Sequence, residues 1–256
     1  MNTAPVILSI GGHDPTGGAG IQADIETITA LGARATTLVT TLTTQDSHNI
    51  YAIEAVAPEP FEARLRKLTR DIPPHAVKIG MIGSVGLIPV LQQLISDSGV
   101  PLVLDPVLAA GGGFDIGNAG LAGGILDCLV PLSTLITPNR AEARRLTGSD
   151  DAEHAAQLLL ESGAGAVLLT GADEAEGRRV INLLFQRGQP VRSFDWPRLP
   201  HGYHGSGCTL ASACVTRLAL GDDPVAAVAA AQEFTWQALR QADRPGSGQW
   251  LPGRRA

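Results

Sequence analysis

VILSIGGHDPTGGAGIQADIETITALG, residues 6–32, contains an apolar run of strand length, a long glycine-rich loop and a segment of helical period, in that order. VILSI (6–10) predicts a buried strand. In 21–32, apolar residues recur at helical spacing and Gly32 follows as a C-cap, which predicts a helix whose buried face carries Ile21, Ile25, Ile28 and Leu31. This strand–loop–helix order is the repeating unit of α/β proteins, and it decides the fold expected here.

The same alternation continues along the chain. Strands are expected at 35–43, 76–82, 101–107, 134–139 and 166–171, and helices at 58–72, 85–99, 120–133, 140–148, 151–163, 208–220 and 224–242. The pattern is weaker between 174 and 200, where 180–186 is a candidate strand and 191–200 an edge strand or a loop. Because the strands are continuously apolar, they indicate a mostly parallel sheet with helices on both faces. We expect one domain over residues 1–256, with 243–256 as an irregular tail.

Composition and charge limit the partners of the chain. Hydrophobic residues make up 44% of the 256 residues, enough for a large core, and the formal net charge is -6. This negative balance excludes a general attraction to nucleic acid or to anionic membranes. The three cysteines are widely spaced without a CxxC pair, so neither a disulfide framework nor a zinc site is expected. The start, MNTAPVILSIGG, has no basic region and too short an apolar run for a signal peptide or a membrane span, so we expect a cytoplasmic protein.

Ligands of open α/β sheets bind beyond the carboxyl ends of the strands, so the glycine-rich and polar stretches there are candidate sites. The first is GGHDPTGGAG (11–20). Its GAGIQA fits the pattern G-x-G-x-x-A, but GGHDPT separates it from the strand end, which argues against dinucleotide binding. The loop is then either simply flexible or a substrate loop, whose glycines admit a ligand close to the main chain. Asp24, on the following helix, either offsets the helix dipole or meets a ligand.

HGSGC (204–208) is the candidate anion site. The glycine turn and the helix start would point successive amides at one place, where the helix dipole adds positive potential. The stretch is neither a Walker A motif nor a nucleophile elbow, because Leu210 stands where the elbow needs a glycine. At a helix start we expect the Cys208 thiol to have a lowered pKa. The alternative is that Cys208 is a small apolar residue that fills the core.

TPNRAE (137–142) places Asn139 and Glu142 three residues apart at a helix start. One interpretation is a capping box, in which the two side chains satisfy the first backbone amides. The other is an amide and a carboxylate beside a magnesium ion that also carries nucleotide phosphates, with Asp105 after a neighbouring strand. Together with the anion site and the first loop, these residues supply what phosphoryl transfer to a hydroxyl group needs.

Six motifs in order carry a resemblance to a known family: GGHDPTGGAGIQAD, VTTLTTQDS, KIGMIGS, LDPVLAAGGG, LITPNRAEA and HGSGCTLAS. Through these motifs, from about residue 6 to residue 220, the chain resembles the hydroxymethylpyrimidine/phosphomethylpyrimidine kinases of thiamine biosynthesis, which belong to the ribokinase superfamily. The resemblance implies a three-layer ribokinase-like α/β fold, ATP as co-substrate, magnesium (Mg2+) and a homodimer. It also implies that phosphate is transferred to hydroxymethylpyrimidine and/or to its monophosphate.

The same resemblance assigns roles to residues. The pocket for the aminopyrimidine corresponds to Gly12, Asp24, Gln45, Met81 and Val107. The anion hole corresponds to Gly205, Ser206 and Gly207, and the residue that activates the substrate oxygen to Cys208, which makes these four the catalytic positions. The magnesium side corresponds to Asp105, Asn139 and Glu142, and the ATP side to Thr137, Thr170 and Gly171.

Departures from the family pattern keep alternatives open. Where family members often read V-x-K-G-G-H, this chain reads LTGAD (169–173), and Gly111 stands where a second lysine is common. The missing lysines motivate a non-catalytic sensor that binds a phosphopyrimidine. A pyridoxal/pyridoxine kinase is the nearest enzymatic alternative, because its ring and hydroxymethyl group are similar. A thiol hydrolase using Cys208 and His204 is disfavoured, since no third orienting residue is evident.

Overall fold

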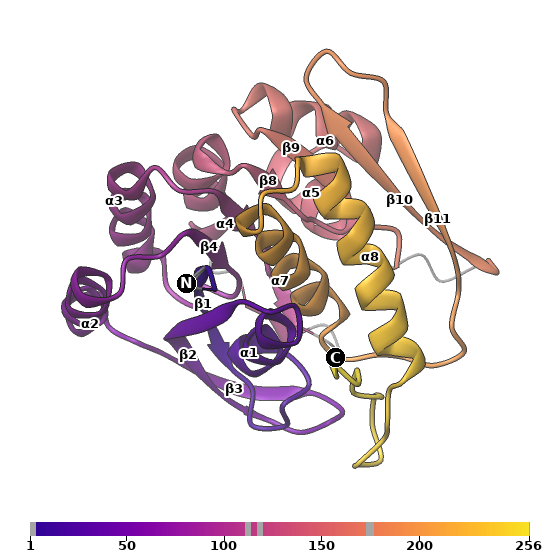
Figure 1. The fold of residues 1–256 in the computed structure, drawn as a ribbon, viewed down its shortest axis with the longest axis horizontal. Coiled ribbons are helices and arrows are strands. Elements are labelled where there is room, and N and C mark those ends of the chain that lie inside the picture. Colours follow the sequence, from indigo (N-terminus) through magenta and orange to yellow (C-terminus); the bar gives the residue numbers. More distant parts are fainter. Residues whose placement is uncertain (1–3, 111–113, 117–119, 173–176, 256) are drawn as a thin grey trace.

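The computed structural model describes residues 4–110, 114–116, 120–172 and 177–255. A nine-stranded sheet runs through the molecule in the order β11-β10-β9-β8-β5-β4-β1-β2-β3 (Figure 1). Its strands are β1 (Val6–His13), β2 (Arg34–Gln45), β3 (Ile50–Ala55), β4 (Ala76–Ile79), β5 (Leu102–Leu104), β8 (Leu135–Ile136), β9 (Ala166–Leu169), β10 (Arg179–Gln186) and β11 (Arg192–Pro197), and a separate short hairpin pairs β6 (Ala109–Ala110) with β7 (Phe114–Asp115). From β2 to β9 the neighbouring strands are parallel, whereas β3 at one edge and β10 with β11 at the other are antiparallel. The predicted mostly parallel sheet is confirmed.

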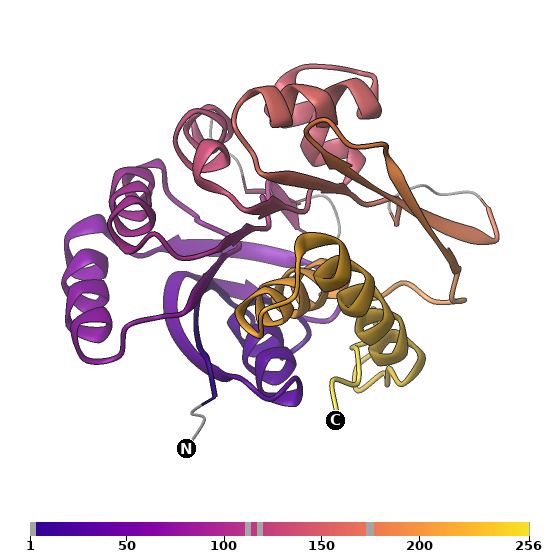
Figure 2. The same cartoon turned by 45° about the horizontal axis from the view of Figure 1, so that its top comes forward.

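Helices cover both faces of this sheet and complete three layers (Figure 2). One face carries α1 (Gly20–Ala30), α7 (Ser206–Ala219) and α8 (Pro224–Arg240), and the other carries α2 (Pro58–Asp71), α3 (Ile88–Ser98), α4 (Leu121–Gly124), α5 (Arg140–Thr147) and α6 (Ala152–Glu161). Successive residues of β1 enter different cores, Ile7 on the α7 face and Leu8 on the α3 face, because side chains alternate across a strand. Within the described ranges, no helix is long and apolar enough to cross a membrane.

Three local features differ from the sequence-based expectation. β3 was not predicted, because this edge strand is largely exposed and lacks a continuous apolar run. Ile25, expected on the buried face of α1, is 40% exposed, since that face is centred on Asp24 instead. The helix predicted at 120–133 is a regular α-helix only over α4, Leu121–Gly124. After α4 it widens into a π turn at Ile125–Leu129 and ends in a 3₁₀ turn at Val130–Leu132.

The central strand β4 carries a charged residue, Lys78, whose side chain is 1% exposed. Its Nζ atom lies 3.1 Å from both carboxylate oxygens of Asp24, which also accepts hydrogen bonds from Ser9 Oγ at 2.5 Å and Ser212 Oγ at 2.7 Å. Burial alone would lower the pKa of the Lys78 ammonium, but the Asp24 carboxylate outweighs it and raises that pKa. The lysine therefore stays charged and joins two strands, α1 and α7 through one buried network.

Replacement of Lys78 by methionine tests this network. Lys78→Met should lower the free energy of unfolding by about 3–5 kcal/mol, because it leaves the buried Asp24 carboxylate without its cation. Urea denaturation followed by circular dichroism measures the change. The control is Lys67→Met on exposed α2, the other of the two lysines in the chain, which should change stability by less than about 0.5 kcal/mol. Equal midpoints for the two variants would contradict a structural role for the buried charge.

Candidate active site

A cavity of about 730 Å³ lies at the carboxyl ends of the parallel strands. Asp105 follows β5, Thr137 follows β8 and Thr170 follows β9, and all three line it. Of the predicted site residues, the structure leaves Asp24 and Gly171 off the cavity wall. It brings the others together: Gly12, Gln45, Met81, Val107, Asp105, Thr137, Asn139, Glu142, Thr170, Gly205, Ser206, Gly207 and Cys208. The segments that follow the strands therefore line one common cavity.

Gly12 and Met81 form a tight contact at one part of this wall. A Cβ added at Gly12 would lie 2.8 Å from Met81 Sδ, so a larger residue there would displace the end of the Met81 side chain. Thr40 Oγ1 donates to the Met81 carbonyl at 2.5 Å and fixes the backbone that carries this side chain. Gln45 and Val107 are partly exposed to the same cavity. These residues give the cavity an apolar surface with one amide, as a flat polar ring would need.

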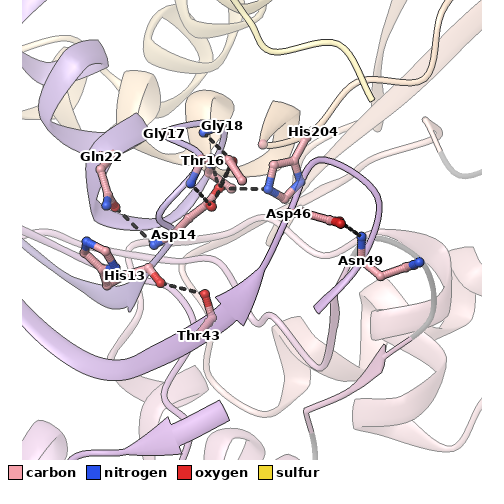
Figure 3. Close-up of polar contacts among 12 residues, drawn as sticks. His13, Asp14, Thr16, Gly17, Gly18, Gln22, Thr43, Asp46, Asn49 and His204 are labelled. Carbon is pink, nitrogen blue, oxygen red and sulfur yellow. Dashed lines mark hydrogen bonds and ion pairs between the residues drawn. The ribbon is translucent and has the colours of Figure 1, made fainter. Parts of the chain in front are cut away.

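The first loop is organised by one buried carboxylate, Asp14 (Figure 3). It accepts hydrogen bonds from the backbone amides of Thr16 and Ala19, each at 2.8 Å. His204 Nε2 lies 2.8 Å from Asp14 Oδ2 and connects this loop to the loop before α7. Burial alone would raise the pKa of Asp14, but hydrogen bonds from His204 and Thr16 lower it, so the carboxylate stays ionised. The sequence signal for this role is the Asp-Pro-Thr-Gly turn, which our prediction passed over.

The loop before α7 closes against the first loop. Gly205 has a φ of 78°, a left-handed conformation that favours glycine, and α7 begins at the next residue. A Cβ at Gly205 would collide with the carbonyl oxygen of Gly18. Thr209 Oγ1 donates to the Gly205 carbonyl at 2.8 Å and secures the turn. The first amides of a helix lack intrahelical partners and point toward its amino terminus, which here borders the cavity. The glycine turn and the helix start expected from HGSGC are thus present at the cavity.

The expectation of a lowered pKa for Cys208 is wrong. Burial raises the pKa of this thiol to about 12, and the carboxylates of Asp105 and Asp24 act in the same direction against the Lys78 ammonium. Desolvation and the two carboxylates disfavour the Cys208 thiolate. Their combined effect on the pKa exceeds the lowering expected from the start of the helix. At neutral pH Cys208 is therefore a protonated thiol on the cavity wall.

Asp24 lies beneath the cavity, fully buried against Lys78, and Lys78 itself reaches the cavity wall. Lys78 Nζ is also 3.8 Å from Asp105 Oδ2. The Lys78 ammonium thus lies between the carboxylates of Asp24 and Asp105. Lys78 was not predicted as a site residue. Its signal in the sequence is a single charge within the apolar run AVKIGMI.

Asn139 and Glu142 form the capping box of α5. Asn139 Oδ1 accepts from the Glu142 amide at 2.8 Å, and Glu142 Oε2 accepts from the Asn139 amide at 2.9 Å. The described part of the chain contains no group of three or more His, Cys, Asp or Glu side chains that could hold a metal. Asp105 Oδ2 and Thr137 Oγ1 are buried at the cavity and have no hydrogen-bond partner among the described residues. This donor set fits a magnesium ion held by one or two carboxylates together with phosphates and water.

A further part of the wall is aromatic and was not predicted. Trp196 of β11 and Trp236 of α8 have ring centroids 6.1 Å apart. Gln232 Oε1 accepts hydrogen bonds from Trp196 Nε1 at 3.1 Å and from Asn182 Nδ2 at 2.8 Å. Gly171, expected on the ATP side, is buried off the wall, where its amide donates to Asn182 Oδ1 at 3.0 Å. These residues come from elements that are separate in the sequence, so local patterns do not group them.

Comparison with known proteins agrees with this geometry. The phosphomethylpyrimidine kinase family model matches residues 14–252. The hydroxymethylpyrimidine/phosphomethylpyrimidine kinase of Synechococcus elongatus is 34% identical over 251 residues, 96% of this chain and 95% of that protein. Pyridoxal kinase from Staphylococcus aureus in complex with AMP-PCP and pyridoxal superposes with a TM-score of 0.89 at 26% identity, covering 99% of this chain and 94% of that one. Phosphomethylpyrimidine kinase from Clostridium difficile 630 superposes with a TM-score of 0.79 at 29% identity, covering 92% and 99%.

These similarities extend over almost the whole chain, and the solved structures share its three-layer ribokinase-like architecture. With the family model matching through both the first loop and the α7 amino terminus, the chain belongs to the phosphomethylpyrimidine kinase family.

Proposed function

We propose that this protein uses ATP and magnesium to phosphorylate hydroxymethylpyrimidine and/or its monophosphate in thiamine biosynthesis. The observation that carries the proposal is that the α7 amino terminus, Asp105 and Lys78 line one cavity. A Cβ added at Gly207 would lie 4.0 Å from Asp105 Oδ1, so amide donors, a carboxylate and a buried cation border the same space. A phosphoryl group there meets fixed donors that need no reorganisation as charge develops.

In the proposed reaction the substrate oxygen forms a bond to the γ-phosphorus while the bond from that phosphorus to the bridging oxygen of ATP breaks. ADP leaves, and the proton of a hydroxyl substrate passes to an oxygen of the transferred phosphoryl group and from there to water. The amides of Ser206, Gly207 and Cys208 stabilise charge on the transferred group. Magnesium, when bound, neutralises charge on the ATP phosphates, and the residues that would hold it, directly or through water, are Asp105, Asn139 and Glu142. Cys208, as a neutral thiol, orients the attacking oxygen.

The remaining wall residues divide between the two substrates. We assign Gly12, Gln45, Met81 and Val107 to the pyrimidine ring, because they form the tight apolar surface with one amide. Thr137 and Thr170, at the ends of β8 and β9, are assigned to the ATP side, with Gly171 supporting that wall from behind. Asp24 acts on the site through Lys78 rather than on the ring, since it is fully buried.

Phosphorylation of pyridoxal is the second candidate function. It is favoured by the TM-score of 0.89 to the pyridoxal kinase structure, against 0.79 for the phosphomethylpyrimidine kinase structure. The resemblance of the whole sequence favours the pyrimidine instead. Of the two positions where the family often has lysine, Gly111 lies outside the described residues, and Gly171 is buried off the cavity wall.

The resemblance also leads us to propose a homodimer in the cytoplasm. Two large apolar side chains, Leu42 of β2 and Tyr51 of β3, are 48% and 59% exposed on the antiparallel edge hairpin. Such side chains are a surface that a second copy of the chain could cover. Light scattering of the purified protein measures the assembly.

A coupled ATP assay over three substrates tests the function. Hydroxymethylpyrimidine, its monophosphate and pyridoxal are compared in parallel, with and without EDTA to remove magnesium. We expect ADP formation with at least one of the two pyrimidines, at a higher kcat/KM than with pyridoxal, and loss of the reaction in EDTA. Higher kcat/KM for pyridoxal would support the second candidate. Pyrimidine binding by calorimetry without ADP formation from any of the three would instead support a sensor.

Substitution at Gly205 tests the meeting of the two glycine loops. Gly205→Ala should lower kcat by ~100-fold, because the new methyl group displaces the first loop from the anion site. Gly188→Ala is the matched control: Gly188 also has a left-handed φ, 69°, but a Cβ there meets no atom within 4 Å. Both variants should lose about 1–2 kcal/mol of stability through backbone strain, Gly205→Ala should lose more because its methyl group also collides with the Gly18 backbone, and only Gly205→Ala should lose turnover. Comparable turnover in the two variants would refute the contact as a catalytic requirement.

Two substitutions at Cys208 separate a neutral thiol from a thiolate base. Cys208→Ala should lower kcat about tenfold, the effect of one orienting hydrogen bond, with a smaller change in the KM for ATP. Cys208→Ser should retain most of the turnover, because a hydroxyl replaces a thiol whose pKa of about 12 keeps it protonated. Cys128→Ala, away from the cavity, controls for loss of a cysteine. Equally low turnover for the serine and alanine variants would indicate that a thiolate is needed.

A further inference from the structure

Residues 246–254, called here the C-terminal strap, contact the loops that build the cavity, although the tail was expected only to be irregular. The Gln249 amide donates to the Ser47 carbonyl at 2.8 Å, just beyond β2. Trp250 pairs with the loop before α7, since its carbonyl accepts from the His204 amide at 2.9 Å. The strap therefore reaches two of the chain segments that surround the substrate space.

Arg254 extends the strap into the interior, and its side chain is 1% exposed. Its Nε donates to Thr209 Oγ1 at 2.8 Å, and Nη1 donates to the Gly17 carbonyl at 3.3 Å and to Glu26 Oε2 at 3.0 Å. Nη2 donates to the Gly18 carbonyl. One guanidinium group thus holds the first loop and the first turn of α7 at the same time, and all three of its nitrogens are used.

Its partners are the groups that form the anion site. The Gly18 carbonyl, which Arg254 binds, is the atom against which Gly205 closes (Figure 3 shows Gly18 beside His204). Thr209, the other partner, donates through the same hydroxyl to the Gly205 carbonyl at 2.8 Å. Arg254 therefore binds the Gly18 side of this contact directly and reaches the Gly205 side through the Thr209 hydroxyl.

The charge of Arg254 lies beside the first turn of α7. A cation there is repelled by the positive end of the helix dipole, and the hydrogen bonds of Arg254 and its ion pair with Glu26 offset this repulsion. Glu26 neutralises the charge of Arg254 only in part, because the Glu26 side chain is 53% exposed and water screens the ion pair. An anion bound at the amino terminus of α7 would in contrast gain from an additional buried positive charge nearby.

We propose that Arg254 is a positioning residue for phosphoryl transfer, whose guanidinium group holds the first loop and the α7 amino terminus in the arrangement that receives the phosphoryl group. This role rests on the proposed kinase function. A lysine cannot replace it, because a single ammonium group does not span Thr209 and two carbonyl groups with the geometry of a planar fork.

The experiment compares Arg254→Gln with Arg255→Gln, its exposed neighbour, in the full-length protein. Arg254→Gln should lower kcat by ~10–100-fold with a smaller change in the KM for ATP, and Arg254→Lys should not restore it. Arg255→Gln should match the wild type. In Arg254→Ala, millimolar guanidinium chloride should recover part of the lost turnover, whereas equal sodium chloride should not. Thr209→Val removes the hydroxyl that accepts from Arg254 Nε and donates to the Gly205 carbonyl, so it should also lower kcat, and it serves if the alanine variant does not fold.

Wild-type kcat in Arg254→Gln, or an equal loss in Arg255→Gln, would overturn the proposal. Hydrogen–deuterium exchange of residues 14–20 provides a readout that does not need activity. Exchange there should accelerate in Arg254→Gln and stay unchanged in Arg255→Gln. If the wild type transfers phosphate to none of the substrates, the proposed function fails. The exchange result then still decides whether Arg254 holds the first loop, and unchanged exchange rejects it.

Discussion

The arrangement of this molecule depends on how it buries one lysine. Lys78 stands in an apolar central strand, and its charge is accommodated there because Asp24 receives it at 3.1 Å. Asp24 in turn takes hydrogen bonds from Ser9 in β1 and Ser212 in α7. Buried ion pairs seldom add stability over apolar packing of equal volume. The role of the Lys78–Asp24 pair is therefore to hold structural elements in position. It fixes α1 and α7 against the sheet, and these are the helices that follow the two glycine loops of the cavity.

The strand–helix alternation was sufficient to predict the layers and to indicate which residues line the cavity. The segments 76–82 and 166–171 are apolar apart from Lys78 and Thr170, and a sheet covered on both faces buries such runs. The edge strand β3 has no comparable signal, because an exposed strand needs little apolar surface. The aromatic wall of Trp196 and Trp236 also escaped prediction, since it forms only when β11 and α8 meet. Capping of α5 by Asn139 and Glu142 was foreseen because both partners are local.

Cys208 and Arg254 show why local patterns fail at particular residues. The start of a helix lowers a thiol pKa in isolation, but the surroundings of Cys208 come from β4, β5 and α1, and their carboxylates and low solvation reverse the direction. Arg254 lies in a segment rich in turn formers, where nothing in the sequence marks it as buried. Its partners are Gly17, Gly18 and Thr209, all distant along the chain. Both residues take their chemistry from contacts that exist only after folding.

Burial of Lys78 also determines how the protein reacts with amine-directed reagents. Of the two lysine side chains in the chain, Lys78 is withdrawn from solvent and Lys67 is open to acylation. Lys67 belongs to α2, which covers the sheet face opposite α1, α7 and α8, and it does not line the cavity. A fluorophore or a solid support coupled to the lysine side chain would therefore attach at one defined place, on the sheet face opposite α1, α7 and α8, and away from the cavity.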